Sequence, residues 1–164
     1  MSDKGSVFQK GGGGTNFEQL VQTAFMTTLI IRGNVPCIPS GELSEVAMQV
    51  TNRGYETDDF MATAKSTSGE HRLLVQVKHD ISFTADNEKF KEVINAFWKD
   101  YNNTSIFDKS RDKLIVVKNG LTKDERNHLK SLFNWAVNHA TETDFHLEIN
   151  RIKAKKKRLD VFRS

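Results

Sequence analysis

Residues 57–80, TDDFMATAKSTSGEHRLLVQVKHD, predict a β-hairpin and decide the fold. Apolar side chains alternate with other side chains on both sides of the segment STSGE, as in two paired strands. The alternating positions are Phe60, Ala62, Ala64, Leu73, Val75 and Val77. Ser68-Gly69 suits a two-residue turn. An even-length loop pairs residues whose numbers sum to an odd value, and this register brings the apolar faces of both strands together.

Helical periodicity flanks the hairpin. Asn16 is a good N-cap, and the apolar residues after it recur at spacings of three and four. That first stripe consists of Phe17, Leu20, Val21, Ala24, Phe25 and Leu29. Residues 32–42 hold both prolines and predict a loop, and alternation over residues 46–50 predicts a strand. The hairpin precedes a second amphipathic helix, whose core-facing stripe is Phe90, Val93, Ile94, Phe97, Trp98 and Tyr101.

The last third of the sequence continues this alternation of helices and strands. Residues 114–117 predict a short buried strand, and Thr122 with Glu125 forms a capping box for a further helix. The buried face predicted for that helix is Leu129, Leu132, Phe133, Ala136, Val137 and Ala140. Alternating apolar residues over 145–149 predict a last strand. The order of helix, three strands, helix, strand, helix, strand indicates an α/β protein with a mixed sheet.

The composition is that of one soluble globular domain. The 164 residues suit a single core, and 37% hydrophobic with 27% charged residues excludes the composition of a disordered chain. We expect a flexible Gly-rich leader over residues 1–15, one domain over 16–149, and a basic tail or linker over 150–164. The lone Cys37 points to a reducing, cytosolic compartment. Apolar runs fall far short of the ~20 residues that span a bilayer, so we expect no membrane partner.

Positive charge is concentrated in the tail. Residues 150–164 hold seven of the 24 Lys and Arg residues and one of the 21 Asp and Glu residues. The other 149 residues therefore carry 17 basic against 20 acidic side chains, so the net charge of +3 belongs to the tail. Five clustered cations are candidates for contacts with DNA phosphates, or for a solvated helix end: Lys153, Lys155, Lys156, Lys157 and Arg158.

The hairpin register also predicts a polar site. It sets Asp59 opposite Gln76 or Lys78, and Glu18 is available from the first helix. Carboxylate oxygens, a glutamine oxygen and the backbone carbonyl of Val77 are ligands that a hard cation such as Mg²⁺ prefers. An ammonium beside the metal would stabilise the charge that develops on a phosphate. An Asp–Lys pair across two strands is also an ordinary structural pair, and the pattern alone leaves both interpretations open.

A set of segments in fixed order carries a family resemblance. A glycine-rich leader, NFEQLVQTAF, ETDDFMA, LLVQVKHD and KFKEVINAFWKDY resemble the PD-(D/E)xK nuclease superfamily, from about Gly11 to Tyr101 and more loosely to Ala140. The resemblance is to effector endonuclease domains of bacterial antiphage proteins, those of cyclic-oligonucleotide-activated (CBASS) nucleases and Avs-type STAND NTPases. It implies a restriction-endonuclease-like core that cuts double-stranded DNA with Mg²⁺, or with Mn²⁺, and with little sequence specificity.

The resemblance also assigns roles to residues. Asp59 matches the metal-binding aspartate, Gln76 the acidic position of the D/E-x-K element, Lys78 its lysine, and Glu18 the helix glutamate. Gln76 departs from the pattern because an amide supplies oxygen without negative charge, although related domains often carry QxK. Asp58 remains a second candidate for the metal aspartate. The family further implies a bacterial cytoplasmic protein, activity as a homo-oligomer, and fusion to an ATPase or sensor region.

Three hypotheses follow. The first is a metal-dependent DNA endonuclease that uses Asp59 and Lys78. The second is a nuclease-fold module that binds DNA or oligomerises without catalysis, which the neutral Gln76 keeps open. The third is an interaction domain whose polar hairpin face is only a salt-bridged surface.

Overall fold

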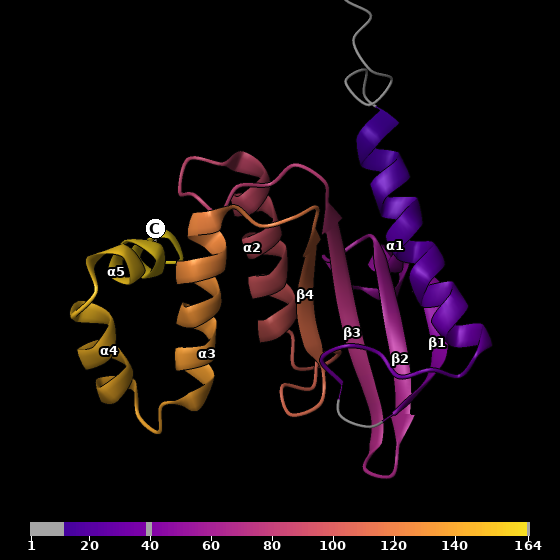
Figure 1. Ribbon diagram of the computed structural model, residues 1–164. Coiled ribbons are helices and arrows are strands. Elements are labelled where there is room, and N and C mark those ends of the chain that lie inside the picture. The colour runs from indigo at the N-terminus through magenta and orange to yellow at the C-terminus, as the bar shows by residue number, and fades with distance from the viewer. Residues whose placement is uncertain (1–11, 39–40, 164) are drawn as a thin grey trace, which may run out of the picture. The chain divides into compact units, whose positions relative to one another are not determined.

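The computed structural model describes residues 12–38 and 41–163 (Figure 1). In chain order the elements are α1 (Gly12–Ile30), β1 (Glu42–Met48), the 3-10 helix η2 (Val50–Arg53), β2 (Phe60–Ser66), β3 (Gly69–Lys78), α2 (Glu88–Asn102), β4 (Lys113–Lys118), the π-helix η3 (Glu125–Leu129), α3 (Lys130–Asn138), α4 (Glu142–Asn150) and α5 (Lys153–Val161). The protein is mixed α/β, with a four-stranded sheet flanked by helices.

The strands lie side by side in the order β1-β2-β3-β4 (Figure 1). β2 is antiparallel to both β1 and β3, whereas β4 is parallel to β3. Two parallel neighbours cannot be joined by a tight turn, and helix α2 lies in the connection between them. The sheet is therefore mixed, as the sequence predicted.

The hairpin has the predicted register. Phe60 pairs with Val75, so paired residue numbers sum to an odd value and the apolar positions of both strands share a face. The predicted turn at Ser68-Gly69 is wrong by one position, because β2 ends at Ser66 and residues 67–68 make the turn. Gly69 is instead the first residue of β3, with a φ of +117° that side-chain-bearing residues rarely adopt.

Helix α1 covers one face of the sheet (Figure 1). Its partly buried residues are Phe17, Val21, Phe25 and Leu29, and they pack against a buried cluster on the strands. That cluster includes Leu43, Phe60, Ala62, Ala64, Leu73, Val75 and Val77. The ring of Phe25 meets the ring of Phe60 edge-on, with centroids 4.9 Å apart. The alternation in the hairpin thus predicted this core correctly.

Several details of the first elements differ from expectation. α1 begins at Gly12, so Asn16 lies inside the helix and is not its N-cap, since glycine weakens a helix without excluding it. The rest of the expected leader, residues 1–11, lies outside the described residues. Leu20 and Ala24 are exposed, because a helix lying on a sheet buries only a narrow stripe. β1 ends at Met48 because Gln49 adopts a left-handed conformation, so the strand predicted over 46–50 is shifted.

The other face of the sheet has its own small core. Val50, Tyr55, Met61, Leu74 and Phe107 are buried there together. Met61 and Leu74 are paired across the hairpin, and the other three come from loops and η2. Both faces of the central strands are therefore covered, which explains why β2 and β3 are buried along most of their length.

The chain divides into two compact units. The first is Met1–Asp80 with Glu92–Asn119 and contains the sheet, and the second is Ile81–Lys91 with Gly120–Ser164. The second unit has a core of Leu129, Leu132 and Ile149, against which Phe83, Trp135, Phe145, Leu159 and Phe162 pack. The predicted capping box is confirmed, since the Glu125 N–H donates to Thr122 Oγ1 at 3.2 Å and the Thr122 N–H donates to Glu125 Oε2 at 2.8 Å.

The predicted last strand is wrong, because residues 142–150 form helix α4. Phe145 and Ile149 are four residues apart and therefore also share one face of a helix. Thr141 caps this helix by accepting the Asp144 N–H at 3.1 Å. Residues 153–161 of the expected basic tail form helix α5.

The helical stripes after the hairpin were predicted too broadly. Trp98 is 67% exposed and Tyr101 is exposed on α2, while Phe90 and Val93 are buried as expected. Phe133, Ala136, Val137 and Ala140, predicted to be buried, are also exposed. Periodicity gives the direction of an apolar stripe but not how many neighbours are present to cover it. None of the helices within 12–38 and 41–163 is long and apolar enough to cross a membrane.

Candidate active site

Asp59 directly precedes β2, at a level where β3 extends beyond β2. β2 begins at Phe60, whereas β3 runs on to Lys78 and pairs there only with β4. The Val77 N–H, which has no β2 partner at this level, donates to Asp59 Oδ2 at 2.5 Å. The carboxylate thus takes the place of a strand carbonyl and is held against the end of β3. The sequence predicted this pairing of Asp59 with residues 76–78 but not the bond to the backbone.

Asp58 and Gln76 form a second contact beside it. Gln76 Nε2 donates to Asp58 Oδ1 at 3.0 Å, and Gln76 is only 3% exposed. A buried amide without a partner would be costly, so this bond fixes the side chain. The amide oxygen of Gln76 is left as the group that can act as a ligand.

The pKa of Asp59 shows that the other predicted site residues lie near it. The pKa of Asp59 is raised to about 6, chiefly by burial, against the opposing effects of the bond from the Val77 N–H and the charge of Lys78. The negative charges of Asp58 and Glu18 raise this pKa further. Two further carboxylates and one ammonium therefore act on Asp59 at this end of the hairpin. Such crowding of like charges is characteristic of sites that bind a cation or perform acid–base chemistry.

Glu18 reaches this region from helix α1. Gln22 Nε2 donates to Glu18 Oε1 at 2.8 Å, one turn along the helix. The neighbouring Phe17 ring meets His79 edge-on with centroids 5.6 Å apart, which places this part of α1 beside the end of β3. The structure thus brings Glu18 to the same end of the sheet as Asp59.

The Lys78 side chain makes no hydrogen bond or ion pair with any of residues 12–38 and 41–163, and it acts on Asp59 through its charge. It is partly buried, the last residue of β3, and pairs in register with Lys118 of β4. An ammonium in this position is available to an anion from outside the chain.

No group of three or more His, Cys, Asp or Glu side chains in the described part of the chain is arranged to hold a metal ion. Mg²⁺ seldom needs such a cage, because it keeps several waters and is usually bound by one or two carboxylates together with substrate phosphates. The donor set of Asp59, Asp58, Glu18 and Gln76 consists of oxygen ligands, which suit this ion. The chemistry of the residues therefore fits Mg²⁺ or Mn²⁺.

Sequence reasoning missed one residue of this region, Asp100. It lies near the end of α2, is 1% exposed, and accepts the backbone N–H groups of Glu56 and Thr57 at 2.8 and 2.9 Å. A signal was present, since Asp100 follows Val93 by seven residues and so occupies the buried stripe of its helix. An acidic residue at a core position requires a partner.

The segment held by Asp100 contains an unpaired hydroxyl. Thr57 is fully buried, and its Oγ1 has no hydrogen-bond partner among the described residues. We expect Thr57→Val to raise the free energy of unfolding by about 1 kcal/mol, because it removes a buried unsatisfied group without changing the shape. Urea denaturation measures this gain. Thr63→Val is the matched control, since the Thr63 hydroxyl donates to Glu45 at 3.4 Å, and equal losses in both variants would contradict the assignment.

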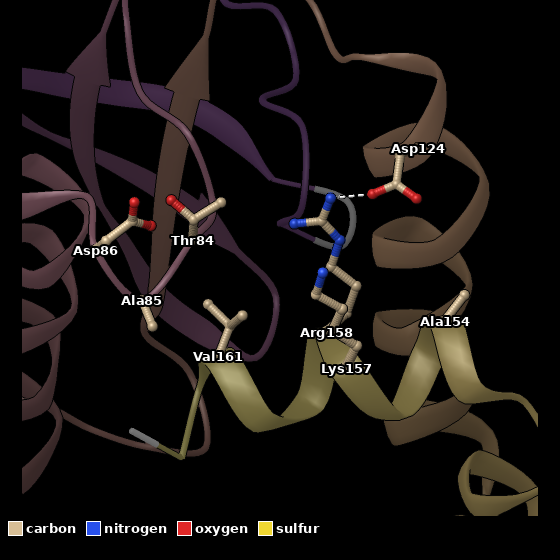
Figure 2. A pocket seen from close by; sticks show the side chains of 8 residues that line it. All are labelled: Thr84, Ala85, Asp86, Asp124, Ala154, Lys157, Arg158 and Val161. Carbon is tan, nitrogen blue, oxygen red and sulfur yellow. Dashed lines mark hydrogen bonds and ion pairs between the residues drawn. The ribbon is translucent and has the colours of Figure 1, made fainter.

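The predicted DNA-binding residues lie in the second unit, and two of them are engaged in its packing. Lys155 is buried with its Nζ 3.3 Å from the centroid of the Trp135 ring. Arg158 donates to the Phe83 carbonyl at 2.8 Å and to Asp124, a pair that Figure 2 shows at the edge of a cavity of about 400 Å³. The hydrogen bond from Arg158 also lowers the pKa of Asp124. Lys153, Lys156 and Lys157 remain exposed on α5.

No protein-family model, curated protein or solved structure matches the chain. The assignment of a function therefore rests on the side chains gathered at the end of β3.

Proposed function

We propose that the chain is a metal-dependent endonuclease that hydrolyses phosphodiester bonds of double-stranded DNA with little sequence specificity. The observation that carries this proposal is the gathering of Asp59, Asp58, Glu18 and Lys78 at one end of the hairpin. The order of helix, three strands, helix and strand around a mixed sheet also agrees with a restriction-endonuclease-like core of the PD-(D/E)xK type.

In this proposal the chain's own residues have distinct tasks. Asp59 binds the ion, with Asp58 or Glu18 and the Gln76 oxygen as further ligands and the Val77 N–H fixing the carboxylate. Bound Mg²⁺ would polarise the phosphate and offset its charge. Lys78 donates to the phosphate and orients the water that adds to phosphorus as the bond to the leaving sugar oxygen breaks. The exposed Lys153, Lys156 and Lys157 supply phosphate contacts.

The resemblance supports a biological setting. We place the chain as the effector part of a bacterial antiphage defence protein, joined to an ATPase or sensor region and active as a homo-oligomer. Two copies acting together would cut both strands of one duplex.

A second function has one observation in its favour. Gln76 occupies the acidic position of the catalytic element, and its amide donates to Asp58, which ties up one oxygen of a candidate ligand. The second candidate is therefore a nuclease-fold module that binds DNA or oligomerises but does not cut DNA.

Plasmid cleavage by the purified chain, over a range of concentrations with Mg²⁺, Mn²⁺ or EDTA, tests the proposal. We expect nicked and linear products that require the metal. If no product forms at any concentration, the assay is repeated with the chain fused to an inducible dimeriser. DNA binding without cleavage under forced dimerisation would contradict the nuclease and favour the inactive module.

A further inference from the structure

We propose that Asp100 is a positioning residue that fixes where the aspartates of the candidate site lie. Its two carboxylate oxygens hold the backbone N–H groups of Glu56 and Thr57, directly before Asp58 and Asp59. The role in metal binding rests on the proposed function, whereas the placement of Asp59 is a structural claim of its own.

The aspartate segment is held at three successive points. Asp100 holds residues 56–57, the Gln49 N–H donates to the Asp59 carbonyl at 3.1 Å, and the ladder with β3 begins at Phe60. Only Asp58 lies between Thr57 and Asp59. A residue of extended chain spans ~3.3 Å, so Thr57 and Asp59 are close along the chain, and we expect a shift of Thr57 to disturb the Asp59 carboxylate.

The bonding of Asp100 is that of a charged clamp. A carboxylate that is 1% exposed is costly to bury unless its oxygens are hydrogen-bonded, and both oxygens of Asp100 are used on backbone groups. The same segment leaves the Thr57 hydroxyl unpaired. The segment is therefore held where Asp100 requires it and not where its own side chain would be satisfied. Such local costs are typical of functional sites.

The chain offers a control in Asp112, a second buried aspartate that lies away from Asp59. This buried aspartate also accepts two backbone N–H groups, from Arg72 at 3.1 Å and Asp108 at 2.8 Å. Its contacts lie in the same unit but serve a loop and the middle of β3. Asp112 also accepts the Arg72 guanidinium, from Nε at 3.1 Å and from Nη2 at 2.6 Å, so Asp112→Asn disturbs an ion pair as well as two backbone contacts, and it does so away from Asp59.

The experiment compares both variants with the unchanged chain in three measurements. Urea denaturation gives their stability, calorimetry gives the Kd for Mn²⁺, and amide hydrogen exchange reports the Val77 N–H that Asp59 accepts. In Asp100→Asn we expect Val77 to exchange at least ~10-fold faster relative to Val75, and Mn²⁺ to bind at least ~10-fold more weakly. In Asp112→Asn we expect a loss of stability, with the exchange of Val77 relative to Val75 and the Kd for Mn²⁺ both unchanged.

Opposite results overturn the proposal. Unchanged Val77 exchange in Asp100→Asn would show that the clamp does not place Asp59, and equal effects in both variants would show a general loss of stability. If Asp100→Asn fails to fold, hydrogen exchange of the unchanged chain tests the proposal. The amides of Glu56, Thr57 and Val77 should then exchange with similar protection. Unprotected exchange of the Glu56 and Thr57 amides would refute the role of Asp100. If the unchanged chain binds no Mn²⁺ and cuts no DNA, the nuclease fails while the exchange data still judge Asp100.

Discussion

Lys78→Ala is expected to lower Mg²⁺-dependent DNA cleavage by about 10²–10³-fold, the usual loss when one preorganised donor to a transition-state anion is removed. The Lys78 side chain makes no hydrogen bond or ion pair with the described residues, so its truncation leaves no side-chain partner unpaired and should keep the fold. The measurement is the initial rate of plasmid nicking at saturating DNA, with circular dichroism as the check on folding.

The matched control is Lys65→Ala. Lys65 lies on β2 of the same hairpin, is exposed, and pairs with Glu70 at 3.6 Å. Exposed ion pairs contribute little to stability, so this variant should retain cleavage within about twofold. Equal losses in both variants would mean that positive charge on the hairpin, and not the position of Lys78, supports activity. Full activity of Lys78→Ala would remove the lysine from the mechanism.

Asp59→Asn is expected to abolish cleavage and yet to stabilise the metal-free protein. Its pKa of about 6 lies above the unfolded value of ~3.9, so the native state binds more protons between pH 4 and pH 6 and loses stability as the pH rises through that window. Asparagine removes the charge and keeps an acceptor for the Val77 N–H. Allowing for solvent screening, we expect the variant to gain about 1 kcal/mol at pH 8 and nothing at pH 4.

Mg²⁺ should make the unchanged chain more stable than Asp59→Asn at pH 8. At a Mg²⁺ concentration ten times its Kd, the unchanged chain gains about 1.4 kcal/mol, whereas Asp59→Asn gains less. Thermal unfolding at pH 4 and pH 8, with EDTA and with Mg²⁺, measures both effects. A variant that is less stable at pH 8 without metal, or equal stabilisation of both proteins by Mg²⁺, would refute this role.

Asp58→Asn settles which aspartate is the main ligand. Both aspartates lie beside Gln76 and Val77, and Asp59 accepts the Val77 N–H, whereas Asp58 accepts the Gln76 amide. We expect Asp58→Asn to lose less cleavage than Asp59→Asn. The reverse order would assign the metal to Asp58.

The register of the hairpin, and with it the placement of Asp59, could be predicted because the alternation of side chains in the sequence specifies how two strands pair. A period of two fixes which residues share a face, and matching the apolar faces fixes the register to within one position. Once Phe60 is set opposite Val75, Asp59 must lie beside residues 76–78. The error in the turn did not matter, since both turns have even length.

The second unit was harder because its patterns fit two structures. Phe145, Leu147 and Ile149 alternate as in a strand, yet Phe145 and Ile149 also share a helix face, and the cap at Thr141 decides between them. The burial of individual side chains was equally hard to predict, because Phe133 and Val137 have the spacing of a buried helix face but are exposed to solvent. Periodicity alone cannot show which neighbours exist.

Asp100 could not be assigned from sequence for a different reason. Its partners are backbone N–H groups 43 and 44 residues away, and every residue except proline carries such a group. The sequence shows only that an acid occupies a core position. Identifying what it holds requires the three-dimensional path of residues 54–59.

The division of the chain has a consequence for synthesis. Residues 81–91 belong to the second unit, whose remaining residues begin at Gly120. Phe90 meets Phe162 at 5.4 Å between centroids, so it must wait for about 70 more residues to leave the ribosome, roughly 4–15 s at typical rates. In the later part of that interval the sheet is fully synthesised, because β4 ends at Lys118, while Phe90 still lacks the ring of Phe162. A nascent chain stalled before α5 therefore has Phe90 without the ring of Phe162, and we expect it to be more open to chaperones and proteases than the completed chain.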